Sequence, residues 1–258
     1  ITGLLLRELE HTNKIDFMSF YARRMKRLFP ALAIVIITSF GLAIILLSTE
    51  EARTQLASLP YAATWTSNLF FAFSAVDYFN ELATKDLFLH TWSLGIEEQF
   101  YLIWPIFLLL VYFFKRKITL KISESSFILS VMVIISLFTS FLLSIYLTDN
   151  SPQSAFYLML SRIWQFSVGA IVYIKRDALK ELQLKTISKK TFTNFIFLTG
   201  LGLIIFSSVI FHNEMVYPGF WAIIPTLGAA LVIISGSSSS ERETGLLTKP
   251  IFVWLGDL

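Results

Sequence analysis

Two adjacent carboxylates, Glu97 and Glu98, stand in the segment His90–Pro105, which runs directly into the wholly apolar stretch Ile106–Phe114. Together the two segments are long enough to enter a bilayer as a helix. Ionisable groups are costly in lipid and are usually retained there for function. We therefore look for chemistry or transport first at this pair of glutamates.

The spacing of the polar residues divides the two carboxylates between different helix faces. Ser93, Glu97 and Tyr101 follow one another at steps of four residues, which places them on one face, with His90 nearby. Glu98 points elsewhere, toward a neighbouring helix. A carboxylate in this setting can hold a substrate hydroxyl, orient a histidine or pair with an intramembrane cation. A buried hydrogen-bond network between helices is the structural alternative, and both remain open.

A second group of chemical interest is the arginine-rich segment Phe20–Pro30. On a helix, Arg24 and Arg27 are three residues apart, and Arg23 and Arg27 are four apart, so their guanidinium groups are neighbours. Guanidinium groups at this spacing suit a polyanion such as a pyrophosphate or a nucleotide phosphate. The alternative is a basic anchor that contacts lipid headgroups.

A third candidate is Arg162, which lies inside an apolar block. We expect it to be the counter-charge for Glu97 or Glu98, with snorkelling to the outer interface as the alternative. The following Gly169-Ala170 step is typical of close helix packing.

Composition gives the elements that must position these groups. Hydrophobic residues make up 55% and charged residues 15%, and the mean hydropathy is +0.67, whereas a soluble domain carries roughly 25% charged residues. The apolar residues come in blocks that approach the length of a membrane-spanning helix. These blocks predict an all-α, polytopic transmembrane helical bundle of about six complete or near-complete spans. They are Ala31–Ser48, Trp92–Phe114, Phe127–Leu147, Phe156–Ile174, Phe192–Phe211 and Phe220–Ser235.

Charge distribution predicts the orientation of these spans. Of the 21 Lys and Arg residues, 18 lie in four segments that we assign to the cytoplasm, and the intervening loops hold only Arg53 and Lys85. The first span then leaves the cytoplasm and Trp92–Phe114 returns to it. The stretch Leu56–Val76 between them must therefore be interfacial or re-entrant. We expect Pro225 to kink or break the last block.

The remaining composition excludes several classes of site. Cysteine is absent and the three histidines lack metal-ligand spacing, so we expect no metal site. The net charge of +3 is explained by the cytoplasmic loops, so we expect no nucleic-acid partner. We interpret residues 1–258 as a single membrane domain truncated at both ends, because Ile1–Leu6 reads as the end of an earlier helix and Ile251 onward as the start of another.

In order along the chain, the motifs resemble the acyltransferase-3 family, which comprises bacterial integral-membrane O-acyltransferases that modify surface glycans. The resemblance covers essentially the whole chain. The segment His90–Pro105 is highly specific and the arginine motif moderately so. The segments that carry the resemblance are Phe20–Pro30, His90–Pro105, Ser161–Phe166, Ile224–Gly228 and Trp254–Leu258.

The resemblance implies that acyl-CoA, usually acetyl-CoA, approaches from the cytoplasm. Its acyl group then passes to a hydroxyl of a glycan outside the bacterial inner membrane, such as lipopolysaccharide O-antigen or another surface polysaccharide. Its residue matches imply that Arg24 and Arg27 hold the CoA phosphates with help from Arg23. They also imply that Ser93 and Glu97 shape the reaction site, and that Arg162 is the family's arginine in a later helix.

Two departures from the family pattern limit this transfer. The family's catalytic histidine lies on a helix upstream of Ile1, so no catalytic base is assigned in this chain, and the fragment alone is expected to be inactive. Gln165 stands where the family usually has a carboxylate. The loop from Val76 to Phe88 is similar to the subgroup that often carries an SGNH-hydrolase-like domain downstream.

Two functions from other classes remain open. In a transporter or flippase, Glu97 and Arg162 would form a coupling or gating pair inside the membrane. A noncatalytic membrane partner of a glycan-assembly enzyme is the other possibility.

Overall fold

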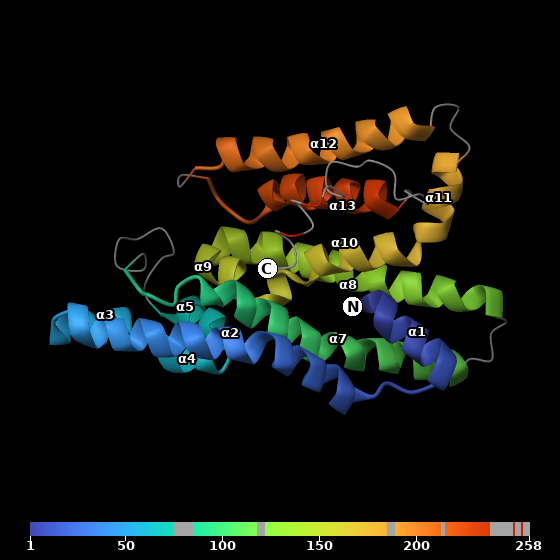
Figure 1. Cartoon of the computed structure of the whole chain (residues 1–258). Coiled ribbons are helices and arrows are strands. Elements are labelled where there is room, and N and C mark those ends of the chain that lie inside the picture. Colours follow the sequence, from blue (N-terminus) through green and yellow to red (C-terminus); the bar gives the residue numbers. More distant parts are fainter. Residues whose placement is uncertain are drawn as a thin grey trace. The chain divides into compact units, whose positions relative to one another are not determined.

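The computed structural model describes residues 1–74, 85–117, 122–184, 189–212 and 215–237, together with Pro250 and Trp254. Within these residues all regular structure is helical, which confirms the all-α prediction (Figure 1). The helices are α1 (Thr2–Thr12), α2 (Phe17–Leu46), α3 (Thr49–Gln55), α4 (Leu59–Ala63), α5 (Ser67–Phe73), α7 (Thr91–Lys117), α8 (Ile122–Asn150), α9 (Pro152–Tyr157), η1 (Met159–Ser161), α10 (Ile163–Ile174), α11 (Arg176–Leu184), α12 (Lys189–Ile210), η2 (Phe220–Ala222) and α13 (Ile223–Ser237).

Four of the described helices are long and apolar enough to cross a membrane, and two apolar helices are shorter. The four come from α2, α7, α8 and α12, at the positions that the apolar blocks predict. This agreement establishes a multi-pass membrane protein. Residues 75–84 of the predicted loop before His90, and most of the predicted segment after Ile251, lie outside the described residues.

The predicted span Phe156–Ile174 is wrong as a single helix. The structure breaks it into the end of α9, the short η1 and the separate helix α10. Two serines supply hydrogen bonds at the break. Ser161 Oγ donates to the carbonyls of Ala155 and Leu158, both at 2.7 Å, and Ser140 Oγ donates to the Leu160 carbonyl at 2.6 Å. Such side-chain bonds let irregular backbone persist inside a helical bundle.

The stretch Leu56–Val76 was predicted to be interfacial or re-entrant, and as far as residue 74 it contains only short helices. α3 is followed by α4 and α5, which are 5 and 7 residues long. A full capping box between Ser48 and Glu51 starts α3. These lengths are far below the roughly 20 residues that a crossing needs.

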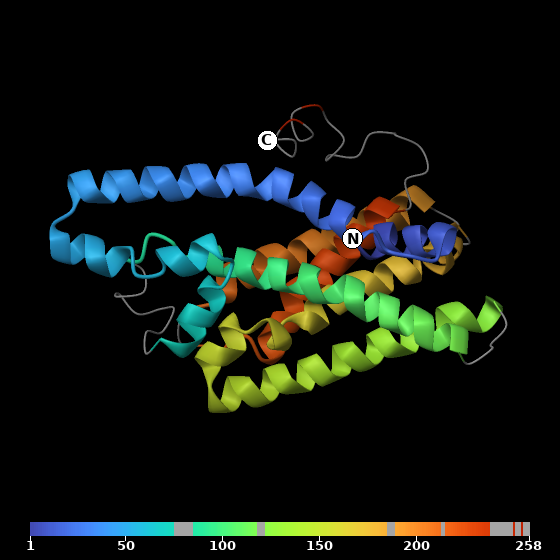
Figure 2. The ribbon, with the colours of Figure 1, turned by 90° about the horizontal axis from the view of Figure 1, so that it is seen from below.

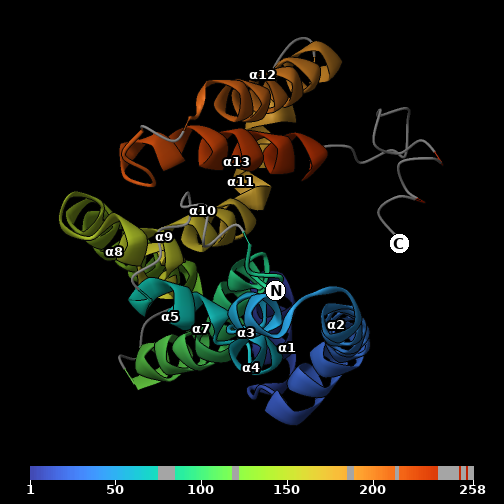
Figure 3. The same cartoon turned by 90° about the vertical axis from the view of Figure 1, so that its left-hand side faces the viewer.

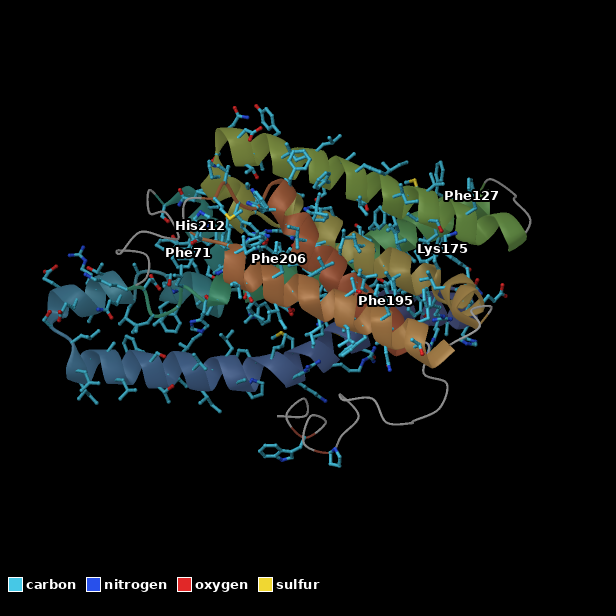
Figure 4. All side chains as sticks on the ribbon, turned by 90° about the horizontal axis from the view of Figure 1, so that it is seen from above. Phe71, Phe127, Lys175, Phe195, Phe206 and His212 are labelled. Atoms are coloured by element: carbon cyan, nitrogen blue, oxygen red, sulfur yellow. The ribbon has the colours of Figure 1, made fainter. Side chains whose placement is uncertain are left out.

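The chain divides into two compact units, and its interpretation as a single domain stays a prediction. Unit 1 comprises residues 1–171 and 212–222, and unit 2 comprises residues 172–211 and 223–258. In unit 2, α12 and α13 pack closely enough that a Cβ on Gly200 would lie 2.7 Å from the Gly228 carbonyl oxygen. Phe195 and Phe206 lie on the exposed surface of α12 (Figure 4).

The last block is interrupted as predicted, because it is divided into the short η2 (Phe220–Ala222) and α13, which begins at Ile223 just before Pro225. Pro225 is the third residue of α13, where the backbone N–H would have no partner within the helix. The predicted close packing at the Gly169-Ala170 step is not found at Gly169 itself, where an added Cβ would meet no atom within 4 Å. Ala170 beside it is buried.

In unit 1, α7 is the helix against which other elements are placed. α1 lies along it, and Trp104 Nε1 donates to Thr2 Oγ1 at 3.0 Å. The Tyr112 hydroxyl donates to Asn13 Oδ1 at the end of α1. Leu5 and Leu9 of α1 are fully buried. Figure 2 shows α4 and α5 near the start of α7, and Figure 3 looks along these helices from that end.

Candidate active site

The side of α7 that faces α5 is held by an amide pair. Asn68 Nδ2 donates to Gln99 Oε1 at 3.1 Å, and Gln99 Nε2 donates back to Asn68 Oδ1 at 2.8 Å. A Cβ on Gly95 would lie 2.7 Å from Asn68 Oδ1 and 3.0 Å from the Trp65 carbonyl oxygen. Glycine is therefore the residue that lets α5 approach α7, and this contact fixes the helix that carries both glutamates.

A different side of α7 meets α2 through Arg24. The Arg24 guanidinium carbon lies 3.1 Å from the centre of the Tyr101 ring, and Nη1 lies 3.9 Å from Glu98 Oε1. The side chains of Arg24 and Glu98 are only 19% and 11% exposed. Close by, the Tyr21 hydroxyl donates to the Leu102 carbonyl at 3.1 Å. Glu98 thus reaches a neighbouring helix, as its position on α7 predicts.

The hydrogen bonds of this pair are incomplete. Arg24 Nε and Glu98 Oε1 are both buried and have no hydrogen-bond partner. A buried polar atom without a partner is unfavourable by about 1–3 kcal/mol and more when it belongs to a charged group. Sites that bind ligands or carry out reactions are where such unused capacity is expected.

The exposed face of α7 carries the other predicted residues. The Tyr101 hydroxyl donates to Glu97 Oε2 at 3.5 Å, which agrees with their predicted shared face. Ser93 Oγ donates to the His90 carbonyl at 3.2 Å. Ser93, His90 and Glu97 are exposed within this structure. The structure therefore brings Glu97, Tyr101, Glu98 and Arg24 together through the Tyr101 ring.

The three arginines of α2 face different surroundings. Arg24 turns toward α7, whereas Arg23 and Arg27 are exposed. Among the described residues Arg23 and Arg27 form no ion pair. Their side chains are therefore accessible to an anionic ligand.

Arg162 is not the counter-charge of either glutamate, so this prediction is wrong. Its Nε and Nη2 both donate to the Phe156 carbonyl, at 3.2 and 3.1 Å. Its guanidinium lies within 6.0 Å of the ring centres of Phe156, Tyr217 and Trp92. The side chain is 6% exposed, so it does not snorkel toward solvent. Arg24 takes the position beside the carboxylate that Arg162 was expected to fill.

A family comparison identifies the chain. The model of the acyltransferase domain family, acyltransferase 3, matches residues 1–258. The chain belongs to this family. The resemblance on which the sequence analysis relied is thereby confirmed over its whole length.

Curated relatives of this acyltransferase domain have related names. O-acetyltransferase OatA of Staphylococcus aureus (strain NCTC 8325 / PS 47) is 30% identical over 98% of this chain and 41% of its own length. YrhL of Bacillus subtilis (strain 168), whose name proposes peptidoglycan O-acetyl transfer, is 28% identical over 99% of this chain and 40% of its own. The chain thus spans about two fifths of the length of these relatives.

Another relative has a similar length to this acyltransferase domain. An uncharacterized protein of Haemophilus influenzae (strain ATCC 51907 / DSM 11121 / KW20 / Rd) is 27% identical over 94% of this chain and 96% of its own length. No solved structure matches the chain.

Sequence reasoning did not find the contacts that hold α7. A glutamine four residues after a glycine inside an apolar segment predicts a polar partner, because a buried amide must be hydrogen-bonded. That pattern points to Gln99, but it cannot name Asn68. Tyr21 was likewise indistinguishable from an interfacial aromatic residue. No group of three His, Asp, Glu or Cys residues in the described part is placed to hold a metal ion.

A polar turn before α7 was also missed. Asp86 Oδ1 accepts a hydrogen bond from Ser58 Oγ at 2.5 Å and another from the Phe88 backbone N–H at 2.8 Å. Burial raises the pKa of Asp86, while these hydrogen bonds and the nearby His90 act in the opposite direction. The turn ties the start of α7 to the segment between α3 and α4.

Proposed function

We propose that the complete protein is a membrane O-acyltransferase that moves an acyl group, most simply acetyl, from cytoplasmic acyl-CoA to a hydroxyl of an extracytoplasmic glycan. In the net reaction the bond between the acyl carbon and the CoA sulfur breaks and a bond to the acceptor oxygen forms. The hydroxyl proton ends on the released thiol. The bacterial inner membrane is the compartment that offers this donor on one side and this acceptor on the other.

The contact between Arg24 and Glu98 is the observation that carries the proposal. Each residue lies about two turns from the start of its helix, and Figures 1 and 2 show α2 and α7 running in opposite directions. The predicted topology assigns the arginine motif to the cytoplasmic side and the start of α7 to the outer side. Their contact supports a transfer site where a donor motif and an acceptor-side motif converge.

Each predicted residue has a role in this proposal. Arg23 and Arg27 bind the phosphates of acyl-CoA directly, and Arg24 on the same helix supports this binding from its position against α7. Glu97 and Ser93 lie where an acceptor hydroxyl would be held. Arg162 supports the start of α7 through its contact with Trp92. The ion pair on which a transporter function depended, Glu97 with Arg162, is not formed among the described residues.

The acceptor is proposed to be a cell-envelope polysaccharide. The name of YrhL favours peptidoglycan, and lipopolysaccharide O-antigen is the other glycan of this class that presents hydroxyls outside the inner membrane. An SGNH-hydrolase-like domain downstream of this chain is part of the same proposal, because the OatA and YrhL relatives are much longer than the chain.

The test is mass spectrometry of purified surface polysaccharides from cells with and without the intact gene. We expect a base-labile acetyl group of 42 Da on one glycan, present only when the gene is intact. Re-expression of the protein with both Arg23 and Arg27 replaced by alanine should fail to restore it, although the protein inserts in the membrane. Identical glycans with and without the gene would refute the proposed function.

A further inference from the structure

The arginine motif of α2 contains two kinds of arginine. Arg23 and Arg27 are exposed and four residues apart, so one anionic ligand can reach both. Arg24 turns the other way and is largely buried against α7. A largely buried guanidinium on a helix that otherwise presents its arginines outward has a different task from theirs.

Two side chains of α7 hold Arg24. The Tyr101 ring lies against the face of the guanidinium, 3.1 Å from ring centre to guanidinium carbon. Glu98 Oε1 lies at its edge, 3.9 Å from Nη1. A face contact and an edge contact together restrict both the position and the tilt of a planar cation.

The ion pair between Arg24 and Glu98 is by itself a poor source of folding stability. At 3.9 Å the ion pair is longer than a charge-assisted hydrogen bond, and both Arg24 Nε and Glu98 Oε1 lack hydrogen-bond partners. A buried pair of this quality contributes little to folding once desolvation is counted. Its effect is instead to fix where α2 lies against α7.

We propose that Glu98 is a positioning residue: through Arg24 and the Tyr101 ring it sets α2 on α7, and thereby sets where Arg23 and Arg27 present to the phosphates of the acyl donor. The inference rests on the proposed function. It separates the two adjacent glutamates, because Glu97 lies on the exposed face and contacts only the Tyr101 hydroxyl among these groups, at 3.5 Å.

The first experiment compares Glu98→Gln with Glu97→Gln in the full-length protein. Initial rates of transfer from radiolabelled acetyl-CoA are measured in membranes, with donor concentration varied and acceptor held constant. For Glu98→Gln we expect the donor KM to rise about tenfold, which corresponds in free energy to the loss of roughly one part-buried ion pair. The kcat of this variant should stay within twofold of wild type. Glu97→Gln should lower kcat and leave the donor KM unchanged.

The second experiment exchanges the charges. Arg24→Glu alone places two carboxylates together and should raise the donor KM beyond the measurable range. Combining it with Glu98→Arg should bring the donor KM back into the measurable range, because the swapped pair restores the attraction between the two helices, although it does not restore the planar cation on Tyr101. A purely structural loss at either position would not be rescued in donor KM by the second change.

A third experiment compares two variants of Tyr101 and leaves the charges of Arg24 and Glu98 in place. Tyr101→Phe keeps the ring beneath Arg24 and should keep the donor KM within twofold of wild type. Tyr101→Leu removes the ring and should raise it several-fold. Equal donor KM values for these two variants would contradict the role of the ring.

The inference is overturned if Glu98→Gln leaves the donor KM within twofold of wild type, or if the charge swap is no better than Arg24→Glu alone. In those outcomes the proposed function still stands, provided that replacing both Arg23 and Arg27 by alanine raises the donor KM. If that double variant also has the wild-type donor KM, donor binding at α2 fails together with the inference.

Discussion

Unit 1 holds two largely buried arginines beside aromatic rings, Arg162 and Arg24, and their guanidinium groups differ in hydrogen bonds and in charge partners. Arg162 has no carboxylate among its described partners, yet its Nε and Nη2 both donate to the Phe156 carbonyl and three rings surround it. Arg24 has a carboxylate 3.9 Å away and a ring at 3.1 Å, but its buried Nε donates to nothing.

This difference separates a structural cation from a functional one. A guanidinium whose donors are used by a neighbouring carbonyl stabilises the backbone that supplies that carbonyl. Here that backbone is the break between α9 and α10, which must satisfy its own polar groups. A guanidinium with an unused donor beside an acid, like Arg24 with its Nε, has capacity left for movement or for a ligand. Burial and charge alone do not distinguish the two arginines, but their hydrogen bonds do.

The largest effect is expected from Arg162→Ala. The change removes two charge-assisted hydrogen bonds to the Phe156 carbonyl, each about 1.5–3 kcal/mol, so the free energy of unfolding should fall by about 4 kcal/mol. Thermal unfolding of the purified protein in detergent, followed by tryptophan fluorescence, measures this. Arg162→Lys should recover part of the loss. An unchanged melting temperature would contradict the structural role of Arg162, and the contrast between Arg162 and Arg24 would no longer hold.

The next effect is on activity rather than stability. Arg24→Lys keeps the charge but loses the planar group that lies on Tyr101. We expect kcat/KM for the acyl donor to fall about 100-fold, which is about 2.7 kcal/mol, while the melting temperature stays within a few degrees of wild type.

Arg27→Lys is the matched control, because Arg27 is exposed on the same helix. A lysine there retains a phosphate contact, so kcat/KM should fall only about threefold. If the two lysine variants lost activity equally, Arg24 would be one more phosphate ligand and its position against α7 would have no special consequence.

The sequence predicted the long helices well, because their apolar runs are continuous. The blocks Trp92–Phe114 and Phe127–Leu147 lie wholly within α7 and α8. The break near Arg162 was missed, since hydropathy is as high on both sides of it. What creates the break is a set of serine side chains that accept or donate to backbone groups. Serine is common in membrane helices, so the positions of these serines in the sequence do not predict a helix break.

The residues of the candidate site were predicted, but the ion pair between Glu98 and Arg24 was not. Faces of α7 follow from helical periodicity, so the neighbours Glu97 and Tyr101 were identified together. Whether Arg24 or Arg162 meets Glu98 depends on how far α2 slides along α7, and no local pattern encodes that offset. The contact of Gly95 with Asn68 depends on the same kind of information.

A pair of glycines tests whether the site depends on the placement of α7. A Cβ on Gly95 would overlap Asn68 Oδ1 and the Trp65 carbonyl, so Gly95→Ala should lower the free energy of unfolding by about 2 kcal/mol. It should also raise the donor KM, because α7 must move to relieve the contact and Glu98 moves with it. Thermal unfolding and donor kinetics on the same preparation measure both effects.

Gly169→Ala is the matched control. A Cβ at Gly169, on α10, meets no atom within 4 Å, and alanine favours a helix over glycine by up to about 1 kcal/mol. This variant should therefore be as stable as wild type or slightly more so. Destabilisation by Gly169→Ala as large as that by Gly95→Ala would show that both effects come from general helix packing rather than from the contact with α5.

The smallest effect is expected at Asp86. Like Arg162, this ionisable side chain is held by neutral partners, which here are Ser58 Oγ and the Phe88 N–H. Burial raises its pKa above the ordinary value, so the folded protein binds this proton more tightly than the unfolded chain. The resulting stability is present at acid pH, below the unfolded value of about 3.9, and is lost as pH rises through the raised pKa.

Asp86→Asn is neutral and keeps an acceptor oxygen for both donors. At pH 8 the free energy of unfolding of this variant should therefore exceed that of wild type by under about 1 kcal/mol, because the group is partly solvated, and the difference should close toward pH 4. A variant that is less stable than wild type at pH 8 would mean that the negative charge itself is required, for instance by His90, and Asp86 would then belong with Glu98 as a charge that acts on a cation.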